Sequence, residues 1–91
     1  MVKIKSPYID GRDKNFIVRE FSSDIEEEDL VWHRDSSDRL VEVIEGDCWS
    51  IQFENSLPVP LIKNVSYWIE NNEWHRLIKG NNRLVLKILE M

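Results

Sequence analysis

Residues 31–46 read Val-Trp-His-Arg-Asp-Ser-Ser-Asp-Arg-Leu-Val-Glu-Val-Ile-Glu-Gly, and this stretch decides the fold class. Apolar and polar side chains alternate on both sides of the Ser-Ser-Asp break. A period of two is typical of strands, whose successive side chains point to opposite faces. Similar short segments, rich in Val, Ile and aromatic residues, recur along the chain. We predict strands at 2–5, 16–21, 30–35, 39–45, 49–54, 59–62, 65–69, 74–78 and 84–89.

Helices have little support in the sequence. The best candidate, Ser23 to Leu30, begins with a residue that can cap a helix N-terminus, but it has almost no apolar stripe, so we expect one turn at most. Short strands spaced by roughly 8–12 residues predict an all-β fold, an antiparallel sandwich or barrel. Because unpaired strand edges invite association, we favour a compact jelly roll that pairs its outer strands in a homodimer.

Length and cysteine content narrow the class of protein. The chain has 91 residues, a size that suits a single domain over 1–91. Its longest apolar runs are far shorter than the roughly 18 residues needed to cross a bilayer, and its start lacks the pattern of a signal peptide. We therefore expect neither a membrane span nor secretion. Cys48 is the single cysteine, which fits the reducing cytoplasm.

The charge distribution argues against nucleic acid as a partner. The net charge is −5, but residues 20–73 hold three basic and fourteen acidic side chains and so carry −11. Such a stretch repels a phosphate backbone. A nucleic-acid-binding barrel would have to rely on a local basic stripe near the N-terminus, formed by Lys3, Lys5, Arg12, Lys14 and Arg19. We rank this class last.

The two histidines of the chain lie in a repeated Trp-His-Arg triplet, at 32–34 and 74–76. His33 and Asp35 are two residues apart, so an extended chain puts the imidazole and the carboxylate on the same face. His75, from a second strand, would complete a triad of two histidines and one carboxylate. Such a triad can hold iron(II), manganese, nickel or zinc and leaves coordination positions open for a ligand.

The turn between 30–35 and 39–45 decides what Arg39 faces. If these two segments form a hairpin, a three-residue loop at 36–38 places Asp35 opposite Arg39. A two-residue loop would instead pair Asp35 with Asp38, an unfavourable pair of like charges, so we prefer the longer loop. Arg39 then either forms an ion pair with Asp35 or binds a substrate carboxylate or phosphate.

The aromatic residues are expected to serve packing. Trp32 and Trp74 point away from the histidines beside them, and we expect them between sheets or at a dimer contact. The alternate apolar residues of 49–53 share one face and are expected in the core. Gln52 lies on the other face of that strand and is, with Arg39, a candidate substrate-binding residue.

The histidine segment resembles the first motif of the cupin family of small jelly-roll barrels, in a match over about half of the chain. That motif has the form H-x-H, three or four residues, E, and about six residues to G. Here His33-Arg34-Asp35, Arg39 and Gly46 fall in the same frame, and Val43-Ile44-Glu45-Gly46 is similar to the family's V-L-E-G. The resemblance implies a cupin-like double-stranded β-helix, which is an antiparallel jelly-roll barrel.

The second cupin motif and two substitutions define the implied ligand set. Lys63-Asn64, Ile69-Glu70 and His75 occupy the places of the second motif, of which the final histidine is kept. Asp35 stands where the family has its second histidine, and a carboxylate also ligates hard metals. Arg39 stands where the family has glutamate, and a guanidinium cannot ligate a cation. The resemblance thus implies three ligands, similar to the iron triad of the oxoglutarate-dependent oxygenases.

Two functions follow from this sequence, and its enzyme status stays open. The first is a small cupin-like protein that binds a divalent metal through His33, Asp35 and His75 and binds or acts on a small molecule. The second is a metal-free jelly-roll module for binding or assembly, in which Asp35 and Arg39 form a pair. Residues 1–29 lie outside the matched motifs, and they either complete the outer sheet or exchange with a partner subunit.

Overall fold

Antiparallel strands make up most of the described chain, which comprises residues 8–13 and 15–91 in this computed structural model. The one short helix there is a 3-10 turn, η1 (Glu27–Asp29), and no helix in these residues has the length and hydropathy to cross a membrane. The strands are β1 (Ile9–Arg12), β2 (Ile17–Phe21), β3 (Arg39–Glu45), β4 (Ser50–Phe53), β5 (Val59–Pro60), β6 (Ser66–Ile69), β7 (His75–Ile78) and β8 (Leu84–Glu90).

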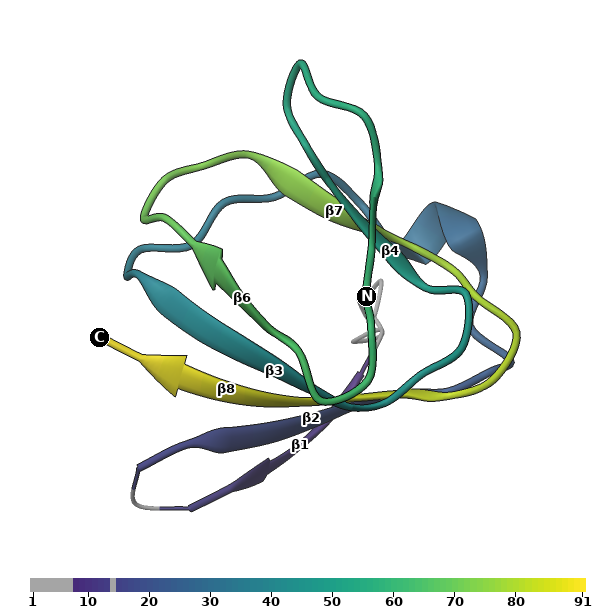
Figure 1. Ribbon diagram of the computed structural model, residues 1–91, viewed down its shortest axis with the longest axis horizontal. Helices are drawn as coiled ribbons and strands as arrows, with labels where there is room; N and C mark the ends of the chain where they lie inside the picture. Colours follow the sequence, from purple (N-terminus) through teal and green to yellow (C-terminus); the bar gives the residue numbers. More distant parts are fainter. Residues whose placement is uncertain (1–7, 14) are drawn as a thin grey trace, which may run out of the picture.

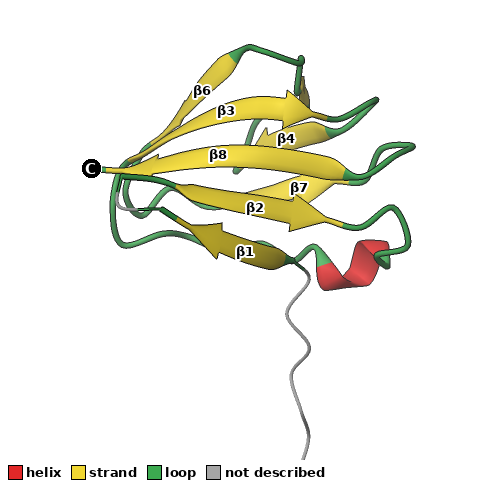
Figure 2. Ribbon diagram, turned by 90° about the horizontal axis from the view of Figure 1, so that it is seen from below, coloured by secondary structure: helices red, strands yellow, loops and turns green. Residues whose placement is uncertain are grey.

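Two sheets curve around a common interior (Figure 1). One sheet has five strands in the order β1-β2-β8-β3-β6, and the other has three in the order β5-β4-β7. The last strand, β8, lies between β2 and β3 and pairs antiparallel with both. Figure 2 shows the larger sheet from outside, with β6 at its upper edge and β1 at its lower edge. The predicted all-β jelly roll is confirmed.

Most strand predictions are confirmed to within a few residues, but one is wrong, one strand of the structure was not predicted, and one prediction lies outside the described residues. Segment 30–35 forms no strand beyond an isolated bridge at His33, and β1 was not predicted, since Ile9–Arg12 includes a glycine and lacks alternation. The predicted strand 2–5 falls outside the described part of the chain. The single turn expected between Ser23 and Leu30 is confirmed as η1.

The hairpin predicted between 30–35 and 39–45 is also wrong. Strand β3 pairs with β6 and β8, while the histidine segment 31–35 lies against β7 on the other sheet. A central strand can have only two neighbours, and β6 and β8 occupy both sides of β3. The loop 36–38 therefore crosses between sheets instead of closing a hairpin.

The core follows the predicted alternation. Trp49 and Ile51 are 1% and 2% exposed, and the indole N–H of Trp49 donates to the carbonyl oxygen of Asn82 at 2.7 Å. The large indole ring contributes much buried apolar surface, and its N–H keeps a hydrogen-bond partner inside the protein. The other buried apolar side chains come mainly from the larger sheet and its flanking loops: Ile17, Phe21, Ile25, Leu30, Val41, Val43, Leu61, Ile69, Leu84, Leu86 and Ile88.

Left-handed residues shape the turns between consecutive strands from β3 to β7. Cys48, Asn55, Asn64 and Asn72 have φ values of 60°, 62°, 68° and 64°. Asparagine tolerates this region because its short side chain can bond to nearby backbone, whereas cysteine has no such advantage. Cys48 is exposed in its turn.

Candidate metal centre

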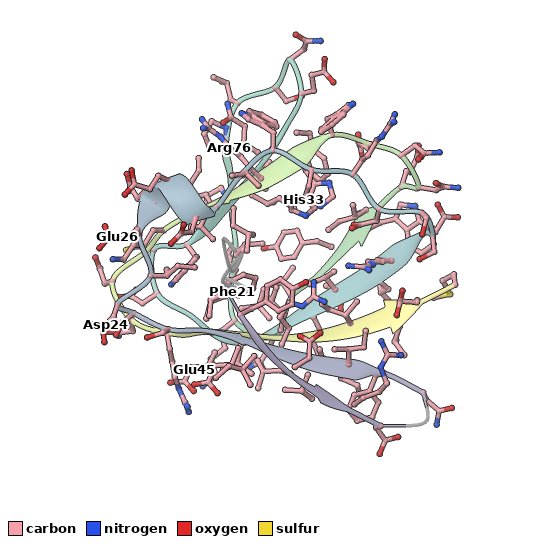
Figure 3. All side chains as sticks on the ribbon, turned by 180° about the vertical axis from the view of Figure 1, so that it is seen from behind. Phe21, Asp24, Glu26, His33, Glu45 and Arg76 are labelled. Atoms are coloured by element: carbon pink, nitrogen blue, oxygen red, sulfur yellow. The ribbon has the colours of Figure 1, made fainter. Side chains whose placement is uncertain are left out.

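The two histidines face each other across a single antiparallel bridge. The backbone N–H of His33 donates to the carbonyl oxygen of His75, and the N–H of His75 donates to that of His33, both at 2.9 Å. Directly opposite residues of an antiparallel pair project to the same face. Their rings are accordingly close, with centroids 4.3 Å apart, and Figure 3 shows His33 pointing to the barrel interior.

The repeated Trp-His-Arg triplet is explained by the same bridge. With His33 opposite His75, the antiparallel register places Trp32 opposite Arg76 and Arg34 opposite Trp74. The guanidinium carbon of Arg76 lies 4.8 Å from the Trp32 ring centroid, and that of Arg34 lies 5.2 Å from the Trp74 centroid. Both stacked pairs lie on the outer face, where Figure 3 places Arg76. The tryptophans point away from the histidines as predicted, but they stack on arginines.

These stacked pairs are expected to stabilise the histidine bridge measurably. In a double-mutant cycle of Trp32→Ala and Arg76→Ala, we expect a coupling energy of about 0.5–1 kcal/mol, the usual range for an exposed cation–π pair. Urea denaturation of the four proteins measures it. As a control, Trp32→Ala combined with Lys87→Ala should be additive, because Lys87 lies over Phe16 on the other sheet. Additivity in both cycles would show that the stacking contributes nothing.

Asp35 enters the interior from the segment that follows His33. Its backbone carbonyl oxygen accepts a hydrogen bond from the N–H of Asn72 at 2.8 Å, and its side chain is 9% exposed. Nη1 of Arg39 lies 3.4 Å from Oδ1 of Asp35. The predicted proximity of these two residues is therefore present, although it arises from the inward face of β3 and not from a hairpin.

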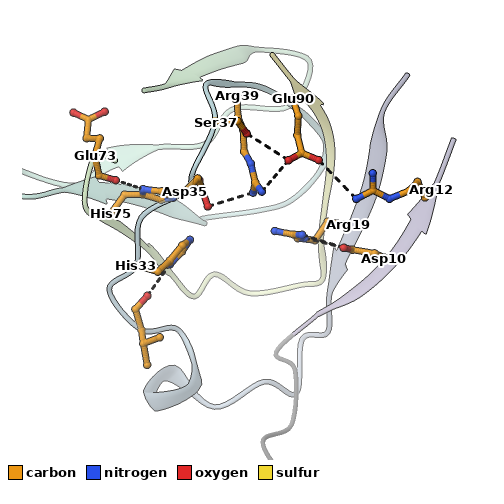
Figure 4. Close-up of polar contacts among 11 residues, drawn as sticks. Asp10, Arg12, Arg19, His33, Asp35, Ser37, Arg39, Glu73, His75 and Glu90 are labelled. Carbon is orange, nitrogen blue, oxygen red and sulfur yellow. Dashed lines mark hydrogen bonds and ion pairs between the residues drawn. The ribbon is translucent and has the colours of Figure 1, made fainter. Parts of the chain in front are cut away.

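The three predicted ligands converge. One potential ligand atom each from His33, Asp35 and His75 can be chosen so that all lie within 4.8 Å of one another. Nε2 of His75 is 3.4 Å from Oδ2 of Asp35 (Figure 4). His75 is 3% exposed, whereas His33 and the rim around it are open to solvent. A small ion could thus reach the cluster past His33.

Backbone carbonyls set the protonation of both rings. Nδ1 of His75 lies 2.7 Å from the carbonyl oxygen of Glu73, and Nδ1 of His33 lies 3.0 Å from that of Val31. A carbonyl oxygen only accepts, so Nδ1 carries the proton and Nε2 of each neutral ring keeps its lone pair. Metal-binding histidines are held in this way by a hydrogen bond from the second ring nitrogen.

This tautomer leaves two acceptors facing each other. Oδ2 of Asp35 is buried and has no hydrogen-bond partner among the described residues, and the atom facing it is the bare Nε2 of His75. Two lone pairs at 3.4 Å with no proton between them repel each other. A divalent cation, with bonds of about 2.1 Å to nitrogen and oxygen, converts that repulsion into ligation. The residues present therefore fit a metal ion.

Burial keeps His75 neutral. It lowers the pKa of His75 below its usual value of 6.5, and the neighbouring His33 and Arg39 lower it further. The carbonyl oxygen of Glu73 and the carboxylate of Asp35 oppose this shift without overcoming it. A neutral imidazole is the form that ligates a metal.

The lowered pKa of His75 predicts how the stability of the metal-free protein depends on pH. Between the folded pKa and 6.5 the unfolded chain binds more protons than the folded chain, so the free energy of unfolding falls as pH falls through this window. Urea denaturation between pH 7.5 and 5 measures the slope, which should be smaller in His75→Gln. Equal slopes in the two proteins would contradict the assignment, because carboxylate contributions are shared by both.

A cavity of about 470 Å³ opens beside the cluster. Its walls include His33, Asp35 and His75 at one side and aliphatic side chains of both sheets elsewhere, among them Val41, Ile51, Leu61, Ile69, Leu77, Leu86 and Ile88. Ligand sites of this kind are mostly apolar, with a few convergent polar groups. Arg39, a predicted substrate-binding residue, also lines the cavity.

Gln52 is the predicted site residue that the structure places elsewhere. It lies on the outer face of β4, in a surface groove shared with Trp32 and Trp74. Its Oε1 accepts a hydrogen bond from Nε of Arg76 at 2.9 Å, and its amide nitrogen donates to the carbonyl oxygen of Ser56. Gln52 thus stands outside the cavity of the metal cluster.

Arg19 is a cavity residue that the sequence reasoning missed. It lies between Ile17 and Phe21 on the same face of β2, and both of those neighbours are buried. The alternation of 17, 19 and 21 was the available signal. Only the barrel shows that a cavity lies in front of this face, since alternation places Arg19 with Ile17 and Phe21 but does not show what packs opposite them.

Solved structures share this fold. A cupin domain from Bordetella pertussis covers 98% of this chain and 99% of its own, with a TM-score of 0.61 and 19% identity. A DMSP lyase matches 82% of this chain at a TM-score of 0.70 and 15% identity. The Fe(II) form of HppE, hydroxypropylphosphonic acid epoxidase, matches 84% at 0.66 and 17%.

These similarities establish the cupin fold, as the sequence motifs implied. The chain spans only 36% of the DMSP lyase chain and 41% of the HppE chain, so both of these proteins contain much that has no counterpart here. No protein-family model matches the sequence, and a comparison with curated proteins gives no match.

Proposed function

We propose that this cupin-fold protein binds one divalent metal ion through His33, Asp35 and His75, and with it a small molecule in the adjacent cavity. The observation that carries the proposal is the buried Oδ2 of Asp35, which has no hydrogen-bond partner within residues 8–13 and 15–91 and faces the bare Nε2 of His75 at 3.4 Å. Two histidines and one carboxylate suit iron(II), manganese, nickel or zinc. The Fe(II) form of HppE supports iron as one candidate.

The chain's own residues would give the site its chemistry. The carbonyl oxygens of Glu73 and Val31 hold both imidazoles with Nε2 free, and Arg39 holds the Asp35 carboxylate in the interior. The aliphatic walls exclude water, which strengthens polar interactions inside the cavity. A divalent ion, when bound, supplies a Lewis acid that polarises an oxygen of the small molecule.

Metal analysis of protein purified without a histidine tag tests the proposal. We expect close to one divalent ion per chain after dialysis against each candidate metal. The melting temperature should rise on metal addition, because a ligand that binds only the folded state stabilises it by about 2.7 kcal/mol at 100 times its Kd. Substoichiometric metal and an unchanged melting temperature with all four metals would refute it.

One observation favours the second candidate function, a metal-free binding module. Arg39 lies 3.4 Å from Asp35 and so already compensates the buried carboxylate in part. In that case chelator and added metal would both leave the stability of the protein unchanged. Arg39→Gln would nevertheless destabilise it, because the Asp35 carboxylate would lose its partner. Leaving a buried carboxylate unpaired typically costs 3–5 kcal/mol.

A further inference from the structure

Two arginines point into a cavity that is otherwise mostly aliphatic. Arg19 of β2 and Arg39 of β3 have side chains that are 13% and 16% exposed, and both line the cavity beside the metal cluster. A guanidinium in such a position loses much of its hydration and needs negative partners. The other inward-facing positions of β2 and β3 carry buried apolar side chains, so the two arginines are exceptions on the inner faces of these strands.

The partners of Arg19 leave one end of its guanidinium free. Nε and Nη2 donate to the two carboxylate oxygens of Asp10, at 2.8 and 3.0 Å, and the group stacks 3.7 Å from the Tyr8 ring centroid. These contacts fix the plane of the guanidinium. Nη1 makes no hydrogen bond to the described residues, and it is the part of the fork that remains for a ligand.

Arg39 is also incompletely paired. Its Nε is buried without a hydrogen-bond partner in the described chain, and its two ion-pair contacts, to Asp35 and Glu90, are both 3.4 Å long. Strong charge-assisted hydrogen bonds are shorter, at about 2.7–2.9 Å. Arg39 therefore retains donor capacity next to the cluster, as Figure 4 shows for its position between Asp35 and Glu90.

We propose that Arg19 and Arg39 form an anion subsite that binds the carboxylate of a small organic acid inside the cavity. This inference rests on the proposed function for the metal ion, which would bind a second oxygen of the same ligand. The aliphatic walls select an apolar body for that ligand. A volume of about 470 Å³ lies within the range of sites for small organic molecules.

The charge count favours a single negative charge on the ligand. Arg19, Arg39 and a divalent ion carry four positive charges, and their partners Asp35, Asp10 and Glu90 carry three negative ones. Arg12 also lies 3.7 Å from Glu90, but its side chain is 69% exposed and does not line the cavity, so water screens its charge. Both histidines stay neutral as metal ligands. One positive charge is left over, which a carboxylate neutralises and a doubly charged phosphonate exceeds. The acidic side chains of Glu28 and Asp29 near the rim also disfavour a dianion.

The experiment compares butyrate, butyramide and propylphosphonate on zinc-loaded protein by calorimetry and ligand-observed NMR, at a pH above the second pKa of the phosphonate, so that it is a dianion. Butyrate should bind at least 10-fold more tightly than either of the others. Arg19→Gln and Arg39→Gln should each weaken butyrate binding at least 10-fold, and Arg19→Lys should give an intermediate loss because lysine keeps the charge without the fork. Arg83→Gln is the matched control, since Arg83 pairs with Glu20 and Glu45 on the exterior.

Zinc content and thermal melts of every variant separate this inference from the proposed function. Retained zinc with equal binding of butyrate and butyramide, or tighter binding of propylphosphonate, would overturn the carboxylate subsite and leave the metal site standing. The butyrate titration is repeated on protein from which metal has been removed with a chelator and the chelator removed by dialysis. This measurement tests whether the anion subsite exists without a metal site. Butyrate binding that depends on Arg19, in protein that takes up no metal, would support the subsite and refute the proposed function.

Discussion

Asp35→Asn is expected to bind divalent metal at least about 100-fold more weakly than the unchanged protein. Removing a residue that only supports a ligand usually costs 10–100-fold in affinity, so removing a direct ligand should cost more. The amide has nearly the shape of the carboxylate but lacks its charge, and its NH2 group donates where the site needs an acceptor. Calorimetric titration with zinc and manganese measures the affinity.

Asp24→Asn provides the matched control. Asp24 is exposed in the loop before η1 and does not line the cavity, so the affinity of the Asp24→Asn protein for metal should be unchanged. His33→Ala and His75→Ala should lose metal as Asp35→Asn does. His75→Ala removes a buried ring and is expected to be less stable, and therefore the isosteric Asp35→Asn is the decisive variant. Unchanged affinity in a folded Asp35→Asn protein would exclude Asp35 as a ligand.

Gly80→Ala is expected to destabilise the protein by about 3 kcal/mol or more, the upper range for overpacking. A methyl group at Gly80 would approach the carbonyl oxygen of Asp47 below any allowed contact, and it would lie 2.6 Å from the backbone nitrogen of Trp49. These are backbone atoms of the β3–β4 turn, which cannot rotate away as a side chain can. The turn also positions Trp49, the largest fully buried side chain.

Gly11→Ala is the control for that prediction. A methyl group there meets nothing closer than 4.0 Å, the carbonyl oxygen of Val18. We expect a change within about 0.5 kcal/mol, or a small gain because alanine restricts the unfolded chain. Chemical denaturation of both variants measures the difference. Equal stabilities would mean that the Gly80 turn shifts freely, and that Trp49 is not held by it.

The convergence of His33, Asp35 and His75 was predictable because alternation places these side chains on the same faces whatever the strand pairing. Alternation places the side chains of His33 and Asp35 on one face. In both Trp-His-Arg triplets the histidine points to the opposite face from the tryptophan and the arginine beside it. What alternation does not provide is the partner of each segment. The predicted hairpin placed Asp35 opposite Arg39 across a turn, and that pairing is wrong. In the structure the two side chains meet because loop 36–38 passes between the two sheets.

The sequence by itself determined the all-β class, most strand bounds, and which side chains share a face, because these depend on a local period of two. The tertiary structure alone decided which strands became neighbours and where a cavity remains between the sheets. Arg19 shows the difference most clearly, since its alternation with Ile17 and Phe21 is visible in the sequence but its position inside a cavity is not. Strand pairing joins residues far apart in the chain, as β2 with β8, and no local pattern specifies such a contact.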